Sequence, residues 1–375
     1  MAWKECTSMS ERRELVRFAS QEGANVSRLS QGFGISRKTA YKWLSRSRAG
    51  EESFRELSRR PRRSPRRTPP EIEALVCNLR RAHPWGGRKI RSRLLADGHE
   101  GVPAASSISA ILRRNGLMQR SLRPQRDYLR FEEDAPNRLW QMDFKGDFLT
   151  GKGRCYPLTV LDDHSRFSIK LSACPNQRTE TVRQQLTHAF QVYGLPDRML
   201  MDNGAPWRGA AADFTHLTAW LIRLGVKISH GRPYHPQTQG KDERFHRTLK
   251  YEVLSHRSSW PDLEDVQRAF DAWRDVYNLY RPHEALADRP PVTRYRPSER
   301  RFPAVLLPIE YPSTDTVRSV SHKGAIRFGG RSIFISEGLS GNPVALRAVG
   351  DGIWGVYFCQ QQVATIDLSS PPSEV

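Results

Sequence analysis

The sequence predicts a multidomain protein with an N-terminal all-α helix-turn-helix region, a central α/β domain built on a mixed sheet, and a small C-terminal β-barrel. Its 375 residues exceed one ordinary domain. Three observations support the division. Capped helices rich in basic residues lie on both sides of an Arg/Pro-rich segment in the region up to 130. Strands alternate with helices from about 136, and β-rich runs broken by glycine lie between 320 and 368.

The segment 10–48 has the cap and turn residues of three short helices. Asn25 is placed to cap the second helix and Ser36 the third. In a helix-turn-helix the last helix enters the major groove by its N-terminal residues. The candidates for DNA contact are the polar residues of that helix, Arg37, Lys38, Thr39 and Lys42. A basic helical bundle with a solvated face is the alternative.

Two further segments complete the N-terminal third. Residues 51–70 combine many arginines and prolines, which prevents helix and strand, so we expect a linker that either follows DNA or is a solvated tether. Residues 71–130 show two amphipathic helices, the second ending at Asn115-Gly116, and predict a second helix-turn-helix-like region. Arg88 and Lys89, on the basic face of the first, are its candidate DNA ligands.

The charge is concentrated in these helical segments. The chain carries a net charge of +20, and residues 1–130 hold 29 Lys and Arg against 12 Asp and Glu, a net of +17. Such a block is typical of proteins that bind a polyanion, with nucleic acid as the default. No long apolar stretch, signal peptide or glycine-rich nucleotide loop occurs, so we expect neither a membrane nor a nucleotide partner. The five scattered cysteines indicate reduced thiols in a cytosolic protein.

The central region predicts a mixed sheet with packed helices. The expected strands are 138–145, 155–162, 166–173, 198–202 and 226–229, and the expected helices are 179–193, 210–224, 240–255 and 262–280.

Three carboxylates of this region are candidates for a metal site. Asp143 lies in an apolar strand, Asp202 ends a strand before the turn Asn203-Gly204, and Glu243 opens a helix. An acid in a strand is costly unless its charge is paired or bound to a cation, and hard divalent cations take oxygen ligands. Each acid taken alone could equally be a surface group or the partner of an arginine.

The helix that carries Glu243 has two distinct faces. At 100° per residue, three potential phosphate ligands lie within roughly 60° of Glu243, and an apolar stripe lies opposite. Asp242 points into the apolar sector and suits a helix cap better than a metal ligand. Together with Lys241, the candidate phosphate ligands of this helix are His246, Arg247 and Lys250.

Several ordered motifs resemble the integrase-type core of bacterial insertion-sequence transposases. They are Trp140-Gln-Met-Asp143, the stretch 158–166, Met201-Asp-Asn-Gly204 and the stretch 235–250. Tyr277-Asn-x-x-Arg-Pro-His-x-Ala-Leu286 matches the segment that commonly closes that core. The resemblance covers roughly 130–290.

The resemblance implies a ribonuclease H-like fold and a catalytic triad of Asp143, Asp202 and Glu243 that holds two Mg²⁺ or Mn²⁺ ions. Forty residues separate the last two acids, slightly more than is typical of such enzymes. The implied reaction is phosphodiester cleavage followed by strand transfer. The implied partners are double-stranded DNA, as transposon ends and target, and further copies of the chain in a dimer or tetramer, in the bacterial cytoplasm at the nucleoid. The neighbouring pair Asp162-Asp163 is the main competitor for the metal, and we assign it a structural role.

The predicted domains are 1–50, 51–70 as linker, 71–130, the catalytic core 131–295 and the barrel 318–370. Two other functions share parts of this pattern. A DNA-binding regulator with an inactive core would need the helix-turn-helix and the charge, and a metal-dependent nuclease would need the triad without joining.

Overall fold

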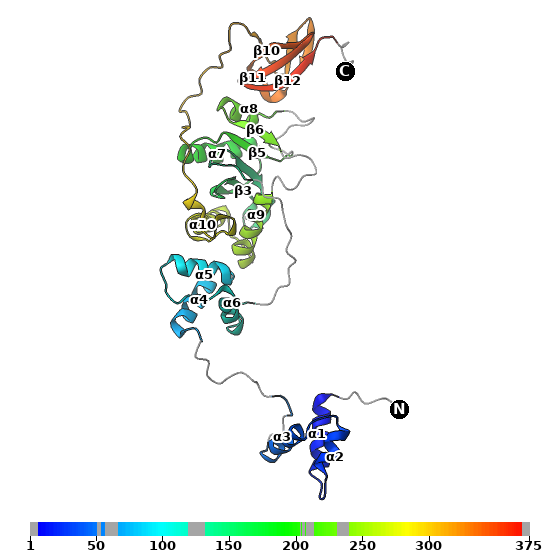
Figure 1. Cartoon of the computed structure of the whole chain (residues 1–375). Helices are drawn as coiled ribbons and strands as arrows, with labels where there is room; N and C mark the ends of the chain where they lie inside the picture. The colour runs from blue at the N-terminus through cyan, green and yellow to red at the C-terminus, as the bar shows by residue number, and fades with distance from the viewer. Residues whose placement is uncertain are drawn as a thin grey trace. The chain divides into compact units, whose positions relative to one another are not determined.

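The computed structural model describes residues 7–50, 54–56, 67–118, 132–202, 204, 207, 214–230 and 240–369. The chain divides into two compact units, residues 1–67 and 68–375 (Figure 1). Most of the predicted linker, the residue Asn203 and the loop 231–239 lie outside the described residues. Among the described residues, no helix has the length and apolar character needed to cross a membrane.

The first unit is a bundle of three helices, α1 (Ser8–Ala19), α2 (Val26–Gly32) and α3 (Arg37–Arg48). Both predicted caps are confirmed. The Asn25 side chain accepts a hydrogen bond from the backbone N–H of Arg28 at 3.1 Å, and Ser36 Oγ accepts one from that of Thr39 at 3.2 Å. The residues of α3 that face the other two helices are buried: Ala40, Trp43 and Leu44.

The second unit begins with three more helices, α4 (Pro70–Ala82), α5 (Gly87–Ala96) and α6 (Ala105–Arg114). At Gly87 a Cβ atom would lie 2.5 Å from the carbonyl oxygen of Ala105, so only glycine lets α5 approach α6 this closely. The helices share an apolar core, and Val276 and Tyr280 of the central domain pack against it.

The central domain is a mixed sheet, as predicted, with six strands where the sequence indicated five. Its strands are β1 (Trp140–Phe144), β2 (Phe148–Thr150), β3 (Gly153–Asp162), β4 (Ser168–Cys174), β5 (Arg198–Met201) and β6 (Lys227–His230). The order is β2-β3-β1-β5-β6, and β4 also pairs with β3. β1, β3 and β4 are antiparallel, whereas β5 and β6 run parallel to β1. The three-residue strand β2 is too short to give a pattern and was not predicted.

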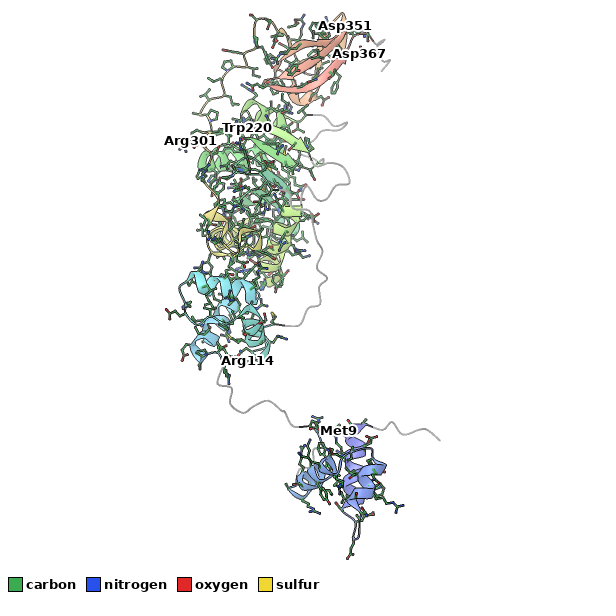
Figure 2. The ribbon with its side chains drawn as sticks, in the orientation of Figure 1. Met9, Arg114, Trp220, Arg301, Asp351 and Asp367 are labelled. Carbon is green, nitrogen blue, oxygen red and sulfur yellow. The ribbon has the colours of Figure 1, made fainter. Side chains whose placement is uncertain are left out.

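Helices cover the two faces of this sheet. The core that contains Trp140 and Met142 of β1 includes α7 (Thr179–Tyr193) and α8 (His216–Arg223). Trp220 of α8, labelled in Figure 2, packs against Phe190 and Phe302. The other face is covered by α9 (Gly240–Glu252) and α10 (Leu263–Asp275). The short helices η3 (Leu254–His256), η5 (Glu284–Leu286) and η6 (Pro291–Thr293) follow these elements, and the π-helical turn η4 (Val276–Tyr280) continues α10.

Side chains of α10 and η4 cover the outer edge of β4. Asn278 accepts a hydrogen bond from the backbone N–H of Ser168 at 2.8 Å and donates one to the carbonyl of the same residue at 3.0 Å. Gln267 binds the Ala173 N–H and the Leu171 carbonyl in the same way. These amide groups replace a further strand, so the edge presents fewer free backbone groups for pairing with another chain.

The C-terminal region corrects one prediction. Its strands are β7 (Thr316–Ser319), β8 (Ala325–Phe328), β9 (Arg331–Phe334), β10 (Pro343–Gly350), β11 (Ile353–Phe358) and β12 (Gln361–Asp367), with the turn η7 (Glu337–Leu339). They form a four-stranded sheet, β12-β11-β10-β7, and a separate β8–β9 hairpin. The small β-barrel expected at 318–370 is therefore not confirmed, because no strand pairing among the described residues closes the sheet. The apolar residues of the four-stranded sheet are covered instead by packing against the hairpin and against Ala219 and Ile222 of α8.

The edge of β4 gives a stability prediction. Asn278→Ala removes both hydrogen bonds to Ser168 and leaves a buried N–H and C=O without partners, which costs about 1–3 kcal/mol for each group. We expect a clearly lower midpoint of thermal unfolding, measured by circular dichroism. Gln184→Ala, on the exposed side of α7, is the matched control and should unfold like the wild type. Equal midpoints for the two variants would show that these bonds contribute little.

Candidate active site

The pairing of β1 with β5 brings Asp143 and Asp202 together. Trp140 lies opposite Met199 and Gln141 opposite Leu200 in this parallel pair. Continuing the register by two residues places Asp143 beside Asp202, at the carboxyl ends of neighbouring strands. Because side chains alternate along a strand and Met142 belongs to the core under α7 and α8, Asp143 points to the opposite face, where α9 lies.

The electrostatics of Asp143 suit a cation. Its side chain is 24% exposed. Burial, together with the negative charge of Asp202, raises the pKa of Asp143 to about 7, although a hydrogen bond from the Phe144 N–H acts in the other direction. Two carboxylates that repel each other in a poorly solvated place are stabilised by a bound cation, and oxygen donors suit Mg²⁺ and Mn²⁺. These two residues therefore fit a divalent metal ion.

The end of β5 is held by local hydrogen bonds. The Gly204 N–H donates to Asp202 Oδ1 at 3.0 Å, and the His230 ring nitrogen Nδ1 lies 2.9 Å from the Asp202 carbonyl oxygen. Trp207 is buried and stacks on Phe144 with ring centroids 5.5 Å apart. Trp207 thus closes the core beside the two aspartates.

The third predicted acid, Glu243, does not lie with the two aspartates in this structure. Glu243 is exposed on α9. Among the described residues, no three His, Cys, Asp or Glu side chains are grouped closely enough to hold a metal ion. The nine residues before α9, 231–239, are outside the described part of the chain. The catalytic and metal-binding role of Glu243 remains a prediction.

Asp242 is the buried acid of α9. Its side chain is 1% exposed, and neither carboxyl oxygen has a hydrogen-bond partner within the described structure. Burial, followed by the charges of Asp143 and Asp163, raises the pKa of Asp242 well above its usual value. Sequence reasoning placed Asp242 correctly in the apolar sector but took it for a helix cap. The signal for its burial is its spacing of three and seven residues from the buried Phe245 and Leu249.

His246 faces the site rather than solvent. Its Nε2 lies 2.8 Å from Thr159 Oγ1, and its Nδ1 lies 3.9 Å from Asp143 Oδ2. Burial, with a smaller effect from Lys145, lowers the pKa of His246 to about 4, so the ring is neutral at pH 7. A side chain held in this way is poorly placed for the phosphate contact expected from the sequence.

The pair Asp162-Asp163 makes structural hydrogen bonds, in agreement with the role assigned from the sequence. Asp162 accepts bonds from the backbone N–H groups of Asn137 and Ser165 at 2.7 and 2.8 Å. Asp163 accepts one from Gln141 Nε2 at 2.6 Å and forms an ion pair with Lys241. Lys241, a predicted DNA ligand, is therefore bound to Asp163, and burial followed by Arg166 lowers its pKa.

The remaining predicted DNA ligands lie on three helices, α3, α9 and α5. On α3, Arg37 and Lys38 are exposed, Thr39 is half-buried, and Lys42 pairs with Glu56 at 2.9 Å. On α9, Arg247 and Lys250 are exposed beside Glu243, as the helical geometry predicts.

The α5 residues face the central domain. Arg88 forms ion pairs with Glu284 at 2.8 Å and Asp288 at 3.1 Å. Burial, with the neighbouring charge of Arg281, lowers the pKa of Lys89 to about 8. In this structure both residues contribute to packing between α5 and the end of the central domain rather than to an open basic face.

The motif at 277–286 anchors α9. Tyr277 is buried and packs edge-on against Phe245 of α9, with ring centroids 4.9 Å apart. Arg281 pairs with Glu252 at the end of the same helix at 2.9 Å, and both side chains are almost fully buried. The Trp273 indole N–H also donates to Glu252 at 3.0 Å. The motif therefore acts on the site through the position of α9.

Comparisons with known protein families agree with this architecture. An integrase core domain model matches residues 133–236 and a second one matches 224–291. A helix-turn-helix domain matches 11–62, and a homeodomain-like domain matches 39–112. The C-terminal domain of IS481 family transposases matches 315–372. These matches show an integrase core preceded by helix-turn-helix domains and followed by a transposase C-terminal domain.

Curated relatives point to the same class. The chain is 28% identical over 153 residues to an uncharacterized 31.7 kDa protein of insertion element IS407 from Burkholderia multivorans, covering 40% of this chain and 53% of the relative. It is 29% identical over 157 residues to an uncharacterized 39.2 kDa protein of IS476 from Xanthomonas euvesicatoria, covering 42% and 43%. The chain thus spans about half the length of these relatives. The chain is therefore similar to insertion-element proteins over its integrase core, and its C-terminal region matches the C-terminal domain of IS481 family transposases.

Solved structures give a weaker comparison. The HTLV-2 integrase catalytic core domain in complex with magnesium is 15% identical, with 44% of this chain and 99% of that chain covered, at a TM-score of 0.35. A chain of a simian T-cell lymphotropic virus intasome is 14% identical, with 78% and 95% covered, at 0.40. Scores this low carry no inference about the site.

The buried charge of Asp143 predicts a pH-dependent stability. Because the pKa of Asp143 is raised in the folded protein, its contribution to the stability of the metal-free protein is fully present below the ordinary value near 4 and is lost as the pH rises through about 7. Asp143→Asn removes this charge, so at pH 8 we expect a midpoint of thermal unfolding higher by about 5 °C. At pH 4 the two proteins should unfold together.

Differential scanning fluorimetry in EDTA measures this difference, with Asp275→Asn on the exposed end of α10 as control. Adding Mg²⁺ at pH 8 should raise the midpoint of the wild type but not that of Asp143→Asn. A variant that unfolds earlier than the wild type at pH 8 would contradict the account of Asp143 as an unpaired buried charge.

Proposed function

We propose that this protein is a DNA transposase of an insertion sequence, which binds the ends of its element and catalyses metal-dependent DNA cleavage and strand transfer. The observation that carries the proposal is the approach of Asp143 and Asp202 at the carboxyl ends of two parallel strands, within an integrase core domain. The arrangement supports a ribonuclease H-like catalytic core.

In this proposal Asp143 and Asp202 hold divalent cations, and Glu243 joins them from α9 when DNA is bound. Two Mg²⁺ or Mn²⁺ ions in such a site activate the attacking oxygen and stabilise the leaving oxygen of an in-line displacement. The protein's own part is to keep the aspartates in register through β1 and β5. Arg247 and Lys250, exposed on the helix that carries Glu243, are suited to hold the DNA backbone.

Recognition and assembly belong to the same proposal. The exposed N-terminal residues of α3, Arg37 and Lys38, are suited to the major groove of the element's ends. Strand transfer requires two ends and a target, so we propose a dimer or tetramer acting on double-stranded DNA. In each copy of the chain, the predicted domains 1–50, 71–130 and 131–295 would take part. The bacterial nucleoid is the corresponding location.

A DNA-binding regulator with an inactive core is the second candidate function. The specific observation in its favour is the exposed Glu243, which is not gathered with the two aspartates. A regulator would bind the DNA ends of the element but would not cleave them with any divalent cation present.

Activity on labelled end DNA separates these functions. With Mg²⁺ or Mn²⁺ the wild type should yield cleaved and joined products, and Asp143→Asn, Asp202→Asn and Glu243→Gln should each reduce them by at least about a thousandfold, because each removes a ligand of the site. Asp275→Asn, with the same loss of one carboxylate on the exposed end of α10, should keep full activity. Binding with no cleavage would establish the regulator, and cleavage with no joining would establish a nuclease.

Recognition by α3 can be tested apart from catalysis. The double substitution Arg37→Ala and Lys38→Ala should weaken binding to end DNA by roughly tenfold or more, since one base contact is worth about 1–3 kcal/mol. The control is the double substitution Arg13→Ala and Arg17→Ala on α1, which also removes two positive charges. Fluorescence anisotropy at several salt concentrations gives both affinities, and equal losses for the two pairs would mean that α3 binds only through its charge.

A further inference from the structure

The site contains a three-residue connection that the carboxylates alone do not explain. Thr159 of β3 lies opposite Asp143 in the antiparallel register of β1 and β3. Its hydroxyl donates a hydrogen bond to the Asp143 carbonyl oxygen at 2.9 Å and also lies 2.8 Å from His246 Nε2. β1, β3 and α9 are thus joined directly at the proposed metal site.

The protons of this connection determine the tautomer of His246. A threonine hydroxyl has a single proton, and that of Thr159 is donated to the Asp143 carbonyl. Between Thr159 Oγ1 and His246 Nε2 the imidazole must therefore be the donor. A neutral ring that carries its proton on Nε2 has an unprotonated Nδ1. The lone pair of Nδ1 is then available on the side of the ring that faces Asp143.

The distance between His246 Nδ1 and Asp143 Oδ2 suits a shared cation. The two atoms are 3.9 Å apart, too far for a hydrogen bond. A first-row divalent ion binds nitrogen and oxygen at roughly 2.0–2.2 Å. One ion can therefore contact both atoms. Without a cation, the nitrogen lone pair and the carboxylate oxygen face each other at this distance with no proton between them.

We infer that His246 is a nitrogen ligand of the metal ion that Asp143 holds, which deepens the proposed function and rests on it. The site is then a mixed oxygen and nitrogen set, and Thr159 is the positioning residue that keeps Nδ1 free. Neither His246 Nδ1 nor Asp143 Oδ2 needs to move far, because both residues lie on packed elements, α9 and β1.

A nitrogen ligand changes the metal preference. Carboxylate and water ligands suit Mg²⁺, whereas imidazole favours the later first-row ions, whose affinities rise from Mn²⁺ to Cu²⁺. His246→Asn should therefore weaken Mn²⁺ binding to the metal-free full-length protein by about tenfold or more, a loss typical even of groups that only orient a ligand. The loss for Mg²⁺ should be smaller.

Pulsed electron paramagnetic resonance of bound Mn²⁺ tests the ligation directly. The wild type should show the modulation of a directly bound ¹⁴N, and growth on ¹⁵N-histidine should convert it to the ¹⁵N pattern without any substitution. His246→Asn should abolish the signal. If His246→Asn does not fold, Thr159→Val tests the same connection, because it removes the hydroxyl that positions His246 and keeps the imidazole.

His230→Asn is the matched control, because His230 also lies beside the site through the Asp202 carbonyl. That variant should keep the nitrogen signal. Bound Mn²⁺ without histidine nitrogen, or a signal lost in His230→Asn instead, would overturn the role of His246 and leave the proposed function intact. Failure to bind Mn²⁺ in the wild type and in His246→Asn alike would overturn both.

Discussion

The position of β1 between β3 and β5 is the constraint on which the rest of the central domain depends. Trp140 and Met142 point into the core under α7 and α8, and Asp143 points to the face of α9. A shift of one residue would turn every side chain to the opposite face. It would turn Asp143 into the apolar core under α7 and α8 and Met142 to the face of α9. The apolar alternation of β1 therefore fixes where its carboxylate lies.

The α9 face of the sheet contains several acidic side chains that are shielded from solvent. Some of them form ion pairs and others do not. Asp163 is paired with Lys241, and Glu252 with Arg281. Removing one partner of such a pair is costly because the other charge stays buried. Neither carboxyl oxygen of Asp242 has a hydrogen-bond partner in the described structure, and the charge of Lys241 does not offset the effect of its burial. The charge of Asp143 is opposed by that of Asp202. In the proposed function, a bound cation would stabilise the carboxylates of Asp143 and Asp202.

The anchoring of α9 joins the fold to the proposed chemistry. Tyr277, Trp273 and Arg281 hold the helix from its buried side. The side chains on its other side, among them Glu243, remain exposed. A helix fixed along one face can present its opposite face to DNA without a change in the core. The motif at 277–286, which contacts neither aspartate, thus serves the site through packing.

Local sequence features were sufficient for much of the architecture. Asn25 and Ser36 identified helix starts because capping depends only on neighbouring backbone groups. The apolar periodicity identified most central strands and helices, and the segment 179–193 matches α7. The strand β2 and the sheet-plus-hairpin arrangement of the C-terminal strands escaped, because strand pairing depends on partners distant in the sequence.

The sequence alone identified the candidate residues for the proposed chemistry: two aspartates at strand ends, an acidic helix start and a basic N-terminal third. The relative positions and the burial of these residues depend on the tertiary structure. Register placed Asp143 beside Asp202, burial separated Asp242 from Glu243, and packing turned Arg88 and Lys89 toward the central domain. It also turned His246 toward Asp143. Helical phase predicts the side of a helix on which a residue lies, but the rotation of that helix against the sheet depends on contacts that no local pattern contains.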